Sequence, residues 1–170
     1  MTVSTTPPVT GVEVPQEDAD AITAFVAEVQ RAQQAALAEE FLTGFRPDAL
    51  WTTAHGRRLI GFDTIADFTR KVLPPTADSD ITATYEVEHI LFIREDIAAV
   101  KIRQRPVTRD GRFLDEVFHG HPDPSALVEA HPDGLPGSPL YILAKDGGVW
   151  RIAAAQNTVV VDPGSLAAAP

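Results

Sequence analysis

The sequence has no cysteine among its 170 residues. A thiol nucleophile, a cysteine-ligated zinc site, an iron–sulfur cluster and a disulfide framework are therefore excluded. Basic residues are also few, because 14 Lys and Arg stand against 24 Asp and Glu, which gives a formal net charge of −10. Proteins that bind nucleic acid carry a basic surface, so this charge predicts that nucleic acid is not a partner.

Long apolar runs are absent as well. No stretch approaches the roughly 20 residues that a membrane-spanning helix needs, so we expect no membrane partner. Residues 1–15 contain neither Lys nor Arg and do not resemble a secretory signal. A chain without cysteine is compatible with a reducing compartment, and we expect a cytoplasmic protein.

The common cofactor motifs are missing too. No GxSxG elbow, phosphate-binding loop or GxGxxG sequence precedes a predicted helix, so esterase, nucleotide-hydrolysing and nicotinamide-dependent activities have no support. His119 and His121 could place two imidazoles on one strand face, but this spacing is not specific for a metal. We therefore expect neither a cofactor nor a metal site.

The length suits a single domain, which we expect over residues 16–162. Residues 1–15 and 163–170 have few apolar side chains to bury and are predicted to be disordered tails. Residues 120–139 are rich in proline and glycine and are predicted to form a loop insertion. Such an insertion either covers a functional site or is a solvent-exposed excursion.

Two helices are predicted near the start of this domain. Apolar residues over 17–41 recur at steps of three, four and seven, which indicates one long amphipathic helix. A shorter stripe over 62–73 indicates a second helix, and Pro74 and Pro75 end it.

The rest of the chain is typical of long antiparallel strands joined by hairpins. Asp110-Gly111 and Asp146-Gly147 are hairpin turn signals. A strand as long as 81–93 rarely stays flat, so we expect a strongly bent sheet and an α+β fold. The predicted strands are 48–53, 57–60, 81–93, 97–108, 113–119, 140–145 and 149–160.

A two-residue loop at 95–96 sets the predicted register of the two longest strands. Glu88 then lies opposite Arg103 on one face, and His89 lies opposite Ile102 on the other face. The same register pairs Glu86 with Arg105. Opposite charges on one face and apolar pairs on the other favour this register.

A two-residue turn at Asp110-Gly111 extends the inner face to the next strand. It places His119 opposite Ile102, so that His89 and His119 lie two strand spacings apart, roughly 9–10 Å. Asp115 shares this face with His119. We interpret His89, His119 and Asp115 as candidate catalytic residues, because imidazoles exchange protons near neutral pH. The alternative is that both histidines are neutral residues of the core.

Several other residues are candidates for substrate binding on the inner face. Gln156 and Asn157 point to opposite faces of a regular strand, so only one of them can reach the inner face unless the strand contains a bulge. Trp51 either forms the floor of the site or fills the core. The predicted binding residues are Trp51, Tyr85, Val87, Ile102, Gln104, Val117, Gln156 and Asn157.

Segments 45–51 (FRPDALW), 56–61 (GRRLIG), 140–148 (LYILAKDGG) and 155–158 (AQNT) carry a family resemblance. They resemble the SgcJ/EcaC family of the nuclear transport factor 2-like (NTF2-like) superfamily, which includes ketosteroid isomerase and SnoaL-like polyketide cyclases. The resemblance implies an NTF2-like cone, in which a strongly bent antiparallel sheet packs on one long and one shorter helix. It also implies a homodimer formed through the outer sheet face and a pocket that binds a hydrophobic, polyketide-like molecule.

Members of that family occur in polyketide and enediyne biosynthesis. The resemblance therefore favours a cofactor-free cyclase, dehydratase or isomerase acting on an apolar polyketide intermediate. Scytalone dehydratase-like members use two histidines and an asparagine, and His89, His119 and Asn157 are similar in type. The ketosteroid isomerase-like members place a carboxylate base where this chain has Thr53. That difference keeps two alternatives open, a non-catalytic protein that binds or shields an intermediate and a dimerising structural module.

Overall fold

The computed structural model describes residues 6–75, 80–115 and 135–160. Within these residues, one seven-stranded sheet has the order β1-β4-β5-β6-β7-β2-β3. The helices are α1 (Gln16–Gln34), α2 (Ala38–Leu42) and α3 (Phe62–Val72). The strands are β1 (Val9–Gly11), β2 (Phe45–Thr52), β3 (Arg58–Ile60), β4 (Ile81–Arg94), β5 (Ile97–Thr108), β6 (Leu140–Asp146) and β7 (Val149–Gln156).

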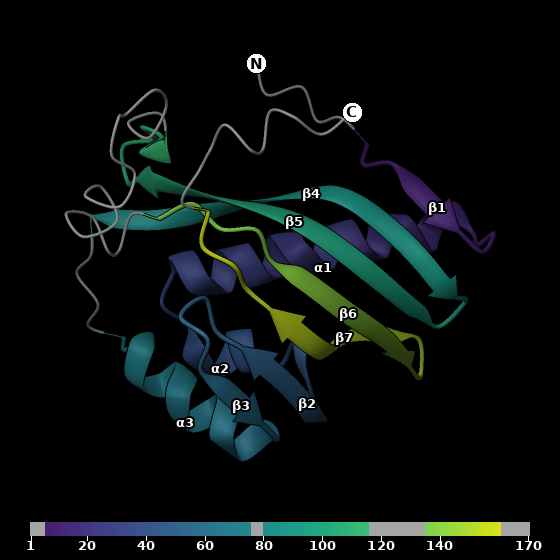
Figure 1. Cartoon of the computed structure of the whole chain (residues 1–170), viewed down its shortest axis with the longest axis horizontal. Helices are drawn as coiled ribbons and strands as arrows, with labels where there is room; N and C mark the ends of the chain where they lie inside the picture. Colours follow the sequence, from purple (N-terminus) through teal and green to yellow (C-terminus); the bar gives the residue numbers. More distant parts are fainter. Residues whose placement is uncertain (1–5, 76–79, 116–134, 161–170) are drawn as a thin grey trace.

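The helices pack on the concave side of a strongly bent sheet (Figure 1). Helix α1 lies along β4, whereas α3 lies beside β2 and β3. Ile22 and Val26 of α1 are buried with Val100 and Ile102 of β5 in one core cluster. The predicted α+β fold with a bent sheet is therefore confirmed. None of the helices in the described residues is long and apolar enough to cross a membrane.

Strand β1 corrects the prediction that residues 1–15 form a tail. Val9–Gly11 pairs in parallel with β4, and the N–H of Ile90 donates to the carbonyl of Pro8 at 3.0 Å. The N–H of Val12 donates to the carbonyl of Phe92 at 2.9 Å. The edge of a long strand presents unpaired backbone groups, and β1 satisfies some of them.

The predicted register of β4 and β5 holds only next to the hairpin loop, where Arg94 pairs with Ile97. Register shifts follow between Phe92 and Arg94 and between Val87 and His89. As a result, the predicted pairs Glu88–Arg103, Glu86–Arg105 and His89–Ile102 are wrong. The observed pairs are Glu86–Arg103, Val87–Ile102 and His89–Lys101.

These shifts have a packing reason. Val87 is packed against the core, and the next buried side chains on β4 are Ile90 and Phe92. A regular strand would bring His89 and Leu91 to that face instead, because successive side chains alternate. A bulge inserts one extra residue and exchanges the two faces, so that Ile90 enters the core.

The hairpin after β5 is one residue longer than predicted. The N–H of Thr108 donates to the carbonyl of Arg112 at 2.9 Å, and Val107 pairs with Phe113. The loop is thus 109–111, with Gly111 at φ +91°, a conformation that glycine adopts without strain. Of the predicted strand 113–119, residues 116–119 lie outside the described residues.

The predicted helix over 17–41 is two helices. Helix α1 ends at Gln34, and Ala36 has φ +53°. The N–H of Leu37 donates to the carbonyl of Ala32 at 2.8 Å, and the N–H of Ala36 donates to that of Gln33 at 3.1 Å. This pair of bonds is a Schellman motif with alanine at the left-handed position that glycine normally fills. The break is invisible in the sequence because the usual glycine is missing.

We predict that Ala36→Gly stabilises the protein by roughly 0.5–1 kcal/mol, because glycine removes the steric cost of the left-handed backbone. The measurement is the midpoint of urea unfolding. Ala35→Gly is the matched control, since Ala35 has φ −90° and gains nothing from glycine. A loss of stability in both variants would contradict the prediction.

Candidate functional site

Polar side chains gather on the inner face of the sheet beyond the end of β6. Tyr85 of β4 lies opposite Gln104 of β5. Gln104 has the same parity as Val100 and Ile102, which are fully buried, so its side chain is on the inner face. The inner face therefore changes from apolar to polar between Ile102 and Gln104.

Asn157 joins this group because β7 contains a bulge. Ile142 pairs with Ala154 and Leu143 pairs with Ile152, so Ala153 is left without a partner in the register. The bulge turns Ala155 into the core. Asn157 is two residues further on and lies on the same inner face as Ala155, whereas Gln156 is exposed. Of the two predicted amides, Asn157 is thus the one on the inner face.

Gly137 makes the contact between the two amides possible. It bridges Gln104 on one side and Val159 on the other. The N–H of Gln104 donates to the carbonyl of Gly137, and the reverse bond is also formed, both at 2.9 Å. A Cβ at Gly137 would lie 2.8 Å from Gln104 Oε1 and 3.1 Å from Asn157 Oδ1. The sequence analysis missed this role, because Gly137 looked like one of several loop glycines.

The hydrogen-bond network fixes the orientation of both amides. The N–H of Thr158 donates to Asn157 Oδ1 at 2.9 Å, so Asn157 Nδ2 must be the donor to Gln104 Oε1 at 3.1 Å. Both amide oxygens are therefore engaged. Among the described residues, Gln104 Nε2 has no hydrogen-bond partner. The Gln104–Asn157 pair consequently presents N–H donors to whatever lies against it.

Tyr85 and Tyr141 add two hydroxyl groups to the same face. Burial raises the pKa of Tyr85 well above its usual value, and the proximity of Tyr141 adds a smaller increase. Burial also raises the pKa of Tyr141. Within the described part of the chain, neither hydroxyl has a hydrogen-bond partner. Both phenols therefore remain neutral near physiological pH and can act as donors.

Helix α1 holds the β4 end of this site in place. The N–H of Tyr85 donates to Gln30 Oε1 at 2.6 Å, and Gln34 Nε2 donates to the carbonyl of Ala83 at 2.8 Å. Between them, Gln33 Oε1 is buried without a partner in the described residues. Side chains of α1 thus replace hydrogen bonds that a further strand would otherwise make.

The apolar residues predicted for the site belong to the core around it. Trp51 contacts the rings of Phe41, Phe45 and Phe68, with centroids 6.1, 5.8 and 5.6 Å apart. Val87 and Ile102 pair with each other beside the polar group. Trp51 and Val87 stay partly exposed, whereas Ile102 is fully buried.

Among the described residues, His89 and Asp115 do not lie on the inner face, where they were predicted as catalytic residues. His89 is on the outer face, where it pairs with Lys101 and its Nε2 lies 2.7 Å from Thr10 Oγ1. The predicted inner position of His89 is therefore wrong, because the β4 bulge reverses its face. His119 and Val117, also predicted for the site, lie outside the described residues.

Asp115 is held by an ion pair with Arg105. Arg105 Nε and Nη2 donate to its two carboxylate oxygens at 2.7 and 3.0 Å. The guanidinium also lies 3.7 Å from the centroid of Phe113. Arg105 alternates with the inner Gln104, so this ion pair is on the outer face. The described residues contain no group of three side chains able to hold a metal ion.

Comparison with known proteins supports the fold. No family model matches the sequence, and no curated protein matches it. A protein of unknown function with a cystatin-like fold from Nostoc punctiforme is 21% identical, with a TM-score of 0.67 over 89% of this chain and 83% of that one.

Two further structures resemble the chain. A ketosteroid isomerase-like protein from Erwinia carotovora atroseptica is 14% identical, with a TM-score of 0.59 over 83% of this chain and 95% of that one. Aln2 from a Streptomyces species is 13% identical, with a TM-score of 0.65 over 86% of this chain and 94% of that one. The chain thus has the cystatin-like, or NTF2-like, cone fold, while membership of the SgcJ/EcaC family stays a prediction.

Alkaline titration tests the burial of Tyr85 and Tyr141, because the chain contains no other tyrosine. A raised pKa in the folded state means that the unfolded state loses its protons first, so stability falls as the pH rises above about 10. We predict that phenolate absorbance stays absent at that pH while the protein is folded. The protein unfolded in urea is the control, and equal titration in both states would refute the prediction.

A double-mutant cycle tests the role of Gly137. Gly137→Ala should destabilise the protein by about 1–3 kcal/mol, because the new methyl group overlaps Gln104 Oε1. In a Gln104→Ala background the nearest overlap is gone, so the same substitution should cost clearly less. Urea unfolding of the four proteins measures this difference. Identical costs in both backgrounds would show that the amide contact does not depend on Gly137.

Proposed function

We propose that this protein binds a neutral, apolar small molecule that directs a carbonyl oxygen at the inner face of the sheet. The observation that carries the proposal is the Gln104–Asn157 pair, which offers N–H donors while both of its oxygens are engaged. A carbonyl oxygen is an acceptor without a donor, so it complements this pair. A ligand placed over the pair would cut these donors off from water, so a ligand that offers them an acceptor is favoured over one that does not.

The neighbouring side chains explain why the ligand should be uncharged and apolar. Tyr85, Val87 and Ile102 are packed in or against the core, and none of them is ionised near neutral pH. Trp51 and Phe68 add aromatic surface. A polyketide-type molecule combines an apolar body with several carbonyl oxygens and fits this chemistry. The predicted resemblance to a family of polyketide and enediyne biosynthesis supports the same ligand class.

Binding without catalysis is the function that the described residues support best. The family resemblance puts Thr53 near the place where ketosteroid isomerase-like members carry the carboxylate base. His89 is on the outer face and Asp115 is engaged by Arg105. A cofactor-free cyclase, dehydratase or isomerase is the second candidate. The neutral Tyr85 hydroxyl and the amide donors favour it, since such groups stabilise an enolate oxygen. In that case His119 would supply the base, as the sequence analysis predicts.

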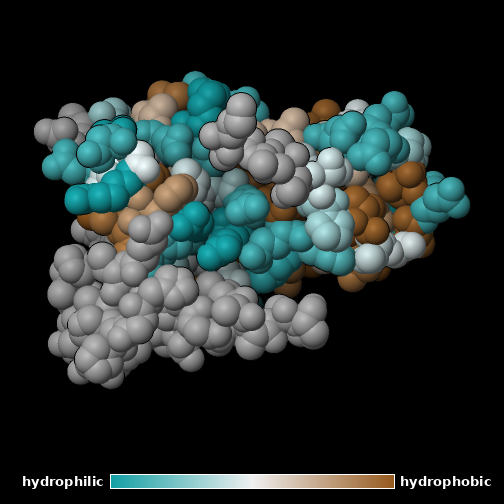
Figure 2. Space-filling model, turned by 90° about the horizontal axis from the view of Figure 1, so that it is seen from above, coloured by the Kyte–Doolittle hydropathy of each residue, from teal (hydrophilic) through white to brown (hydrophobic). Residues whose placement is uncertain are grey.

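A homodimer in the cytoplasm is part of this proposal. A row of apolar residues crosses the outer face of the sheet from β4 to β3. Each residue of the row pairs with the next one on the neighbouring strand, in the order Leu91, Ala99, Ile142, Ala154, Leu50 and Ile60. Leu91, Leu50 and Ile60 are 40%, 46% and 62% exposed. Seen from above, apolar side chains also gather at the end that carries β1 and the β4–β5 hairpin (Figure 2). Association of two copies through this face would cover such side chains.

The binding test uses propionyl-dimethylaminonaphthalene, a neutral aromatic ketone whose emission reports its surroundings. We expect Asn157→Leu to weaken binding of this dye by about tenfold, because the Asn157 N–H donor is lost and Gln104 loses the bond that fixes its amide. Gln156→Leu is the matched control, since Gln156 is adjacent in sequence but exposed. Dimethylaminonaphthalene, which lacks the ketone, should bind equally to both variants. If both variants bind the ketone alike, the proposed site is wrong.

The same ketone separates binding from catalysis. Proton abstraction next to its carbonyl would exchange hydrogen for deuterium in heavy water, which mass spectrometry detects. Under the binding proposal, exchange is no faster with the protein than without it, and His119→Ala changes nothing. Protein-dependent exchange that His119→Ala abolishes would replace the binding proposal with the catalytic one.

A further inference from the structure

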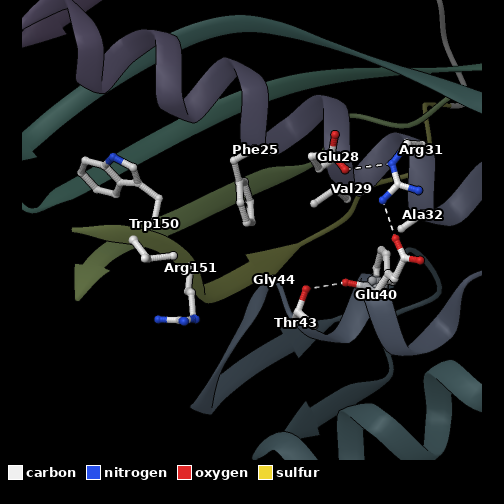
Figure 3. Close-up of a pocket in the computed structure, with 12 residues that line it drawn as sticks. Phe25, Glu28, Val29, Arg31, Ala32, Glu40, Thr43, Gly44, Trp150 and Arg151 are labelled. Atoms are coloured by element: carbon white, nitrogen blue, oxygen red, sulfur yellow. Dashed lines mark hydrogen bonds and ion pairs between the residues drawn. The ribbon is translucent and has the colours of Figure 1, made fainter. Parts of the chain in front are cut away.

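A cavity lies between α1, α2 and the start of β7 (Figure 3). Its volume is about 350 Å³, near the lower end of the range for small-molecule sites. None of Tyr85, Gln104 and Asn157 lines it. We propose that this cavity binds an organic cation, an ammonium group attached to a compact aromatic body.

The walls of the cavity are apolar and largely aromatic. Phe25 and Val29 come from α1, Phe41 comes from α2, and Trp150 comes from β7. Phe25 rests on Gly44, because a Cβ at Gly44 would lie 3.3 Å from the tip of its ring. Gly44 therefore helps to fix the position of the Phe25 ring next to the start of β2. These surfaces suit an aromatic body.

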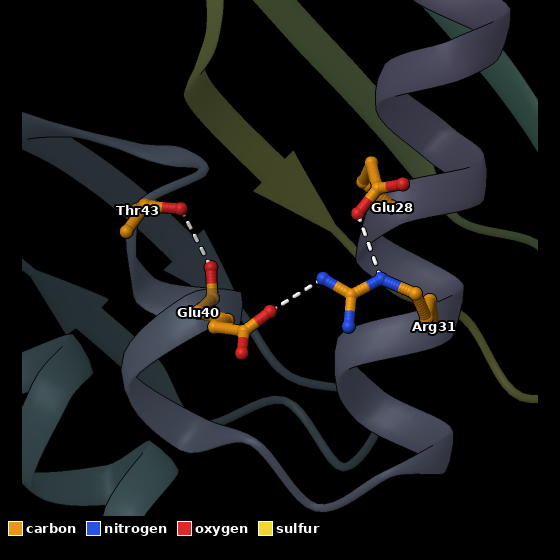
Figure 4. A network of polar contacts seen from close by, with 4 residues as sticks. All are labelled: Glu28, Arg31, Glu40 and Thr43. Atoms are coloured by element: carbon orange, nitrogen blue, oxygen red, sulfur yellow. Dashed lines mark hydrogen bonds and ion pairs between the residues drawn. The ribbon is translucent and has the colours of Figure 1, made fainter.

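Two carboxylates at the edge of the cavity share one cation. Arg31 Nε donates to Glu28 Oε2 at 2.8 Å, and Arg31 Nη2 donates to Glu40 Oε2 (Figure 4). These bonds raise the pKa of Arg31, which stays charged. In the part of the chain that the structure describes, Oε1 of Glu28 and Oε1 of Glu40 have no hydrogen-bond partner. The group of Glu28, Arg31 and Glu40 thus carries a formal charge of −1 and two free acceptor atoms.

Arg151 brings the formal charge of the side chains that line the cavity to zero, so the preference for a cation rests on where the charges lie. Arg151 also lines it, but its guanidinium points away from the ring of Phe25 (Figure 3). An anion would meet Glu28 and Glu40, and the chain as a whole carries a net charge of −10. An ammonium group can instead donate to the free carboxylate oxygens, and the field of the protein attracts it. Charge and aromatic surface therefore select the same kind of ligand.

Three probes of similar shape test this proposal by calorimetric titration at neutral pH and low salt. They are protonated phenethylamine, neutral phenethyl alcohol and anionic phenylpropionate. We expect phenethylamine to bind about tenfold more tightly than the alcohol, because it gains a charge-assisted hydrogen bond. Phenylpropionate should show no binding. Equal affinities for amine and alcohol would overturn the proposal.

Variants locate the site. Glu40→Gln should weaken phenethylamine binding by about tenfold and leave the alcohol unchanged. Glu39→Gln is the matched control, because Glu39 is on the same helix but pairs with Arg70. Val149 lines the cavity and is 49% exposed. The larger side chain in Val149→Phe should therefore fill the cavity and block binding without disturbing the core.

Two results would overturn the proposal even if phenethylamine binds. One is an equal loss of affinity in Glu39→Gln and Glu40→Gln, which would indicate a general effect of charge. The other is a loss in Asn157→Leu, which would place the amine at the inner-face site. Retained binding in Asn157→Leu together with loss in Val149→Phe supports the cavity between α1, α2 and β7 as the binding site. Failure here leaves the function proposed for the Gln104–Asn157 pair untouched, since that pair is tested with a neutral ketone.

Discussion

The bend of the long strands around α1 is the constraint on which the rest of this structure depends. β4 and β5 span Ile81–Arg94 and Ile97–Thr108, and strands of that length must twist and bulge to wrap a helix. Gln30 and Gln34 of α1 hold the backbone of Tyr85 and Ala83 at the bent end. Each bulge reverses the faces of a strand, so the bend also decides which side chains the protein offers to a ligand.

This dependence explains what the sequence predicted and what it did not. Apolar periodicity and turn signals predicted α3, β4, β5 and the Arg94–Ile97 hairpin, because these depend on local preferences. His89 and Asn157 had to be assigned to a face by counting along a regular strand. The count fails at a bulge, since whether Ile90 or His89 enters the core is decided by packing against α1 and β5. Ala36 and Gly137 show the same limit for the backbone, where neighbours distant in sequence impose the conformation.

On the part of the inner face that the structure describes, two amides lie near the place predicted for His89, and this changes the chemistry of the candidate site. An imidazole can take up a proton near neutral pH, whereas the side-chain amides of Gln104 and Asn157 cannot. Their effect is instead directional, because the Thr158 N–H fixes one amide and that amide fixes the other. The selectivity of the described residues therefore comes from the polarity of hydrogen bonds rather than from charge. The high pKa of Tyr85 preserves this neutrality.

The two sites proposed for the molecule have opposite electrical character, and this follows from where each is built. The inner-face site lies between a sheet and a helix, where a charge without a partner would be expensive, so its polar groups are neutral donors. The cavity beside α2 is open at an edge where Glu28, Arg31 and Glu40 remain more than half exposed, so charges are retained there at little cost. A neutral ketone gains nothing from carboxylates, and an ammonium ion cannot accept from amide N–H groups. If both proposals hold, the fold discriminates between these ligands without any change of conformation, because burial separates the proposed donor site from the proposed acceptor site.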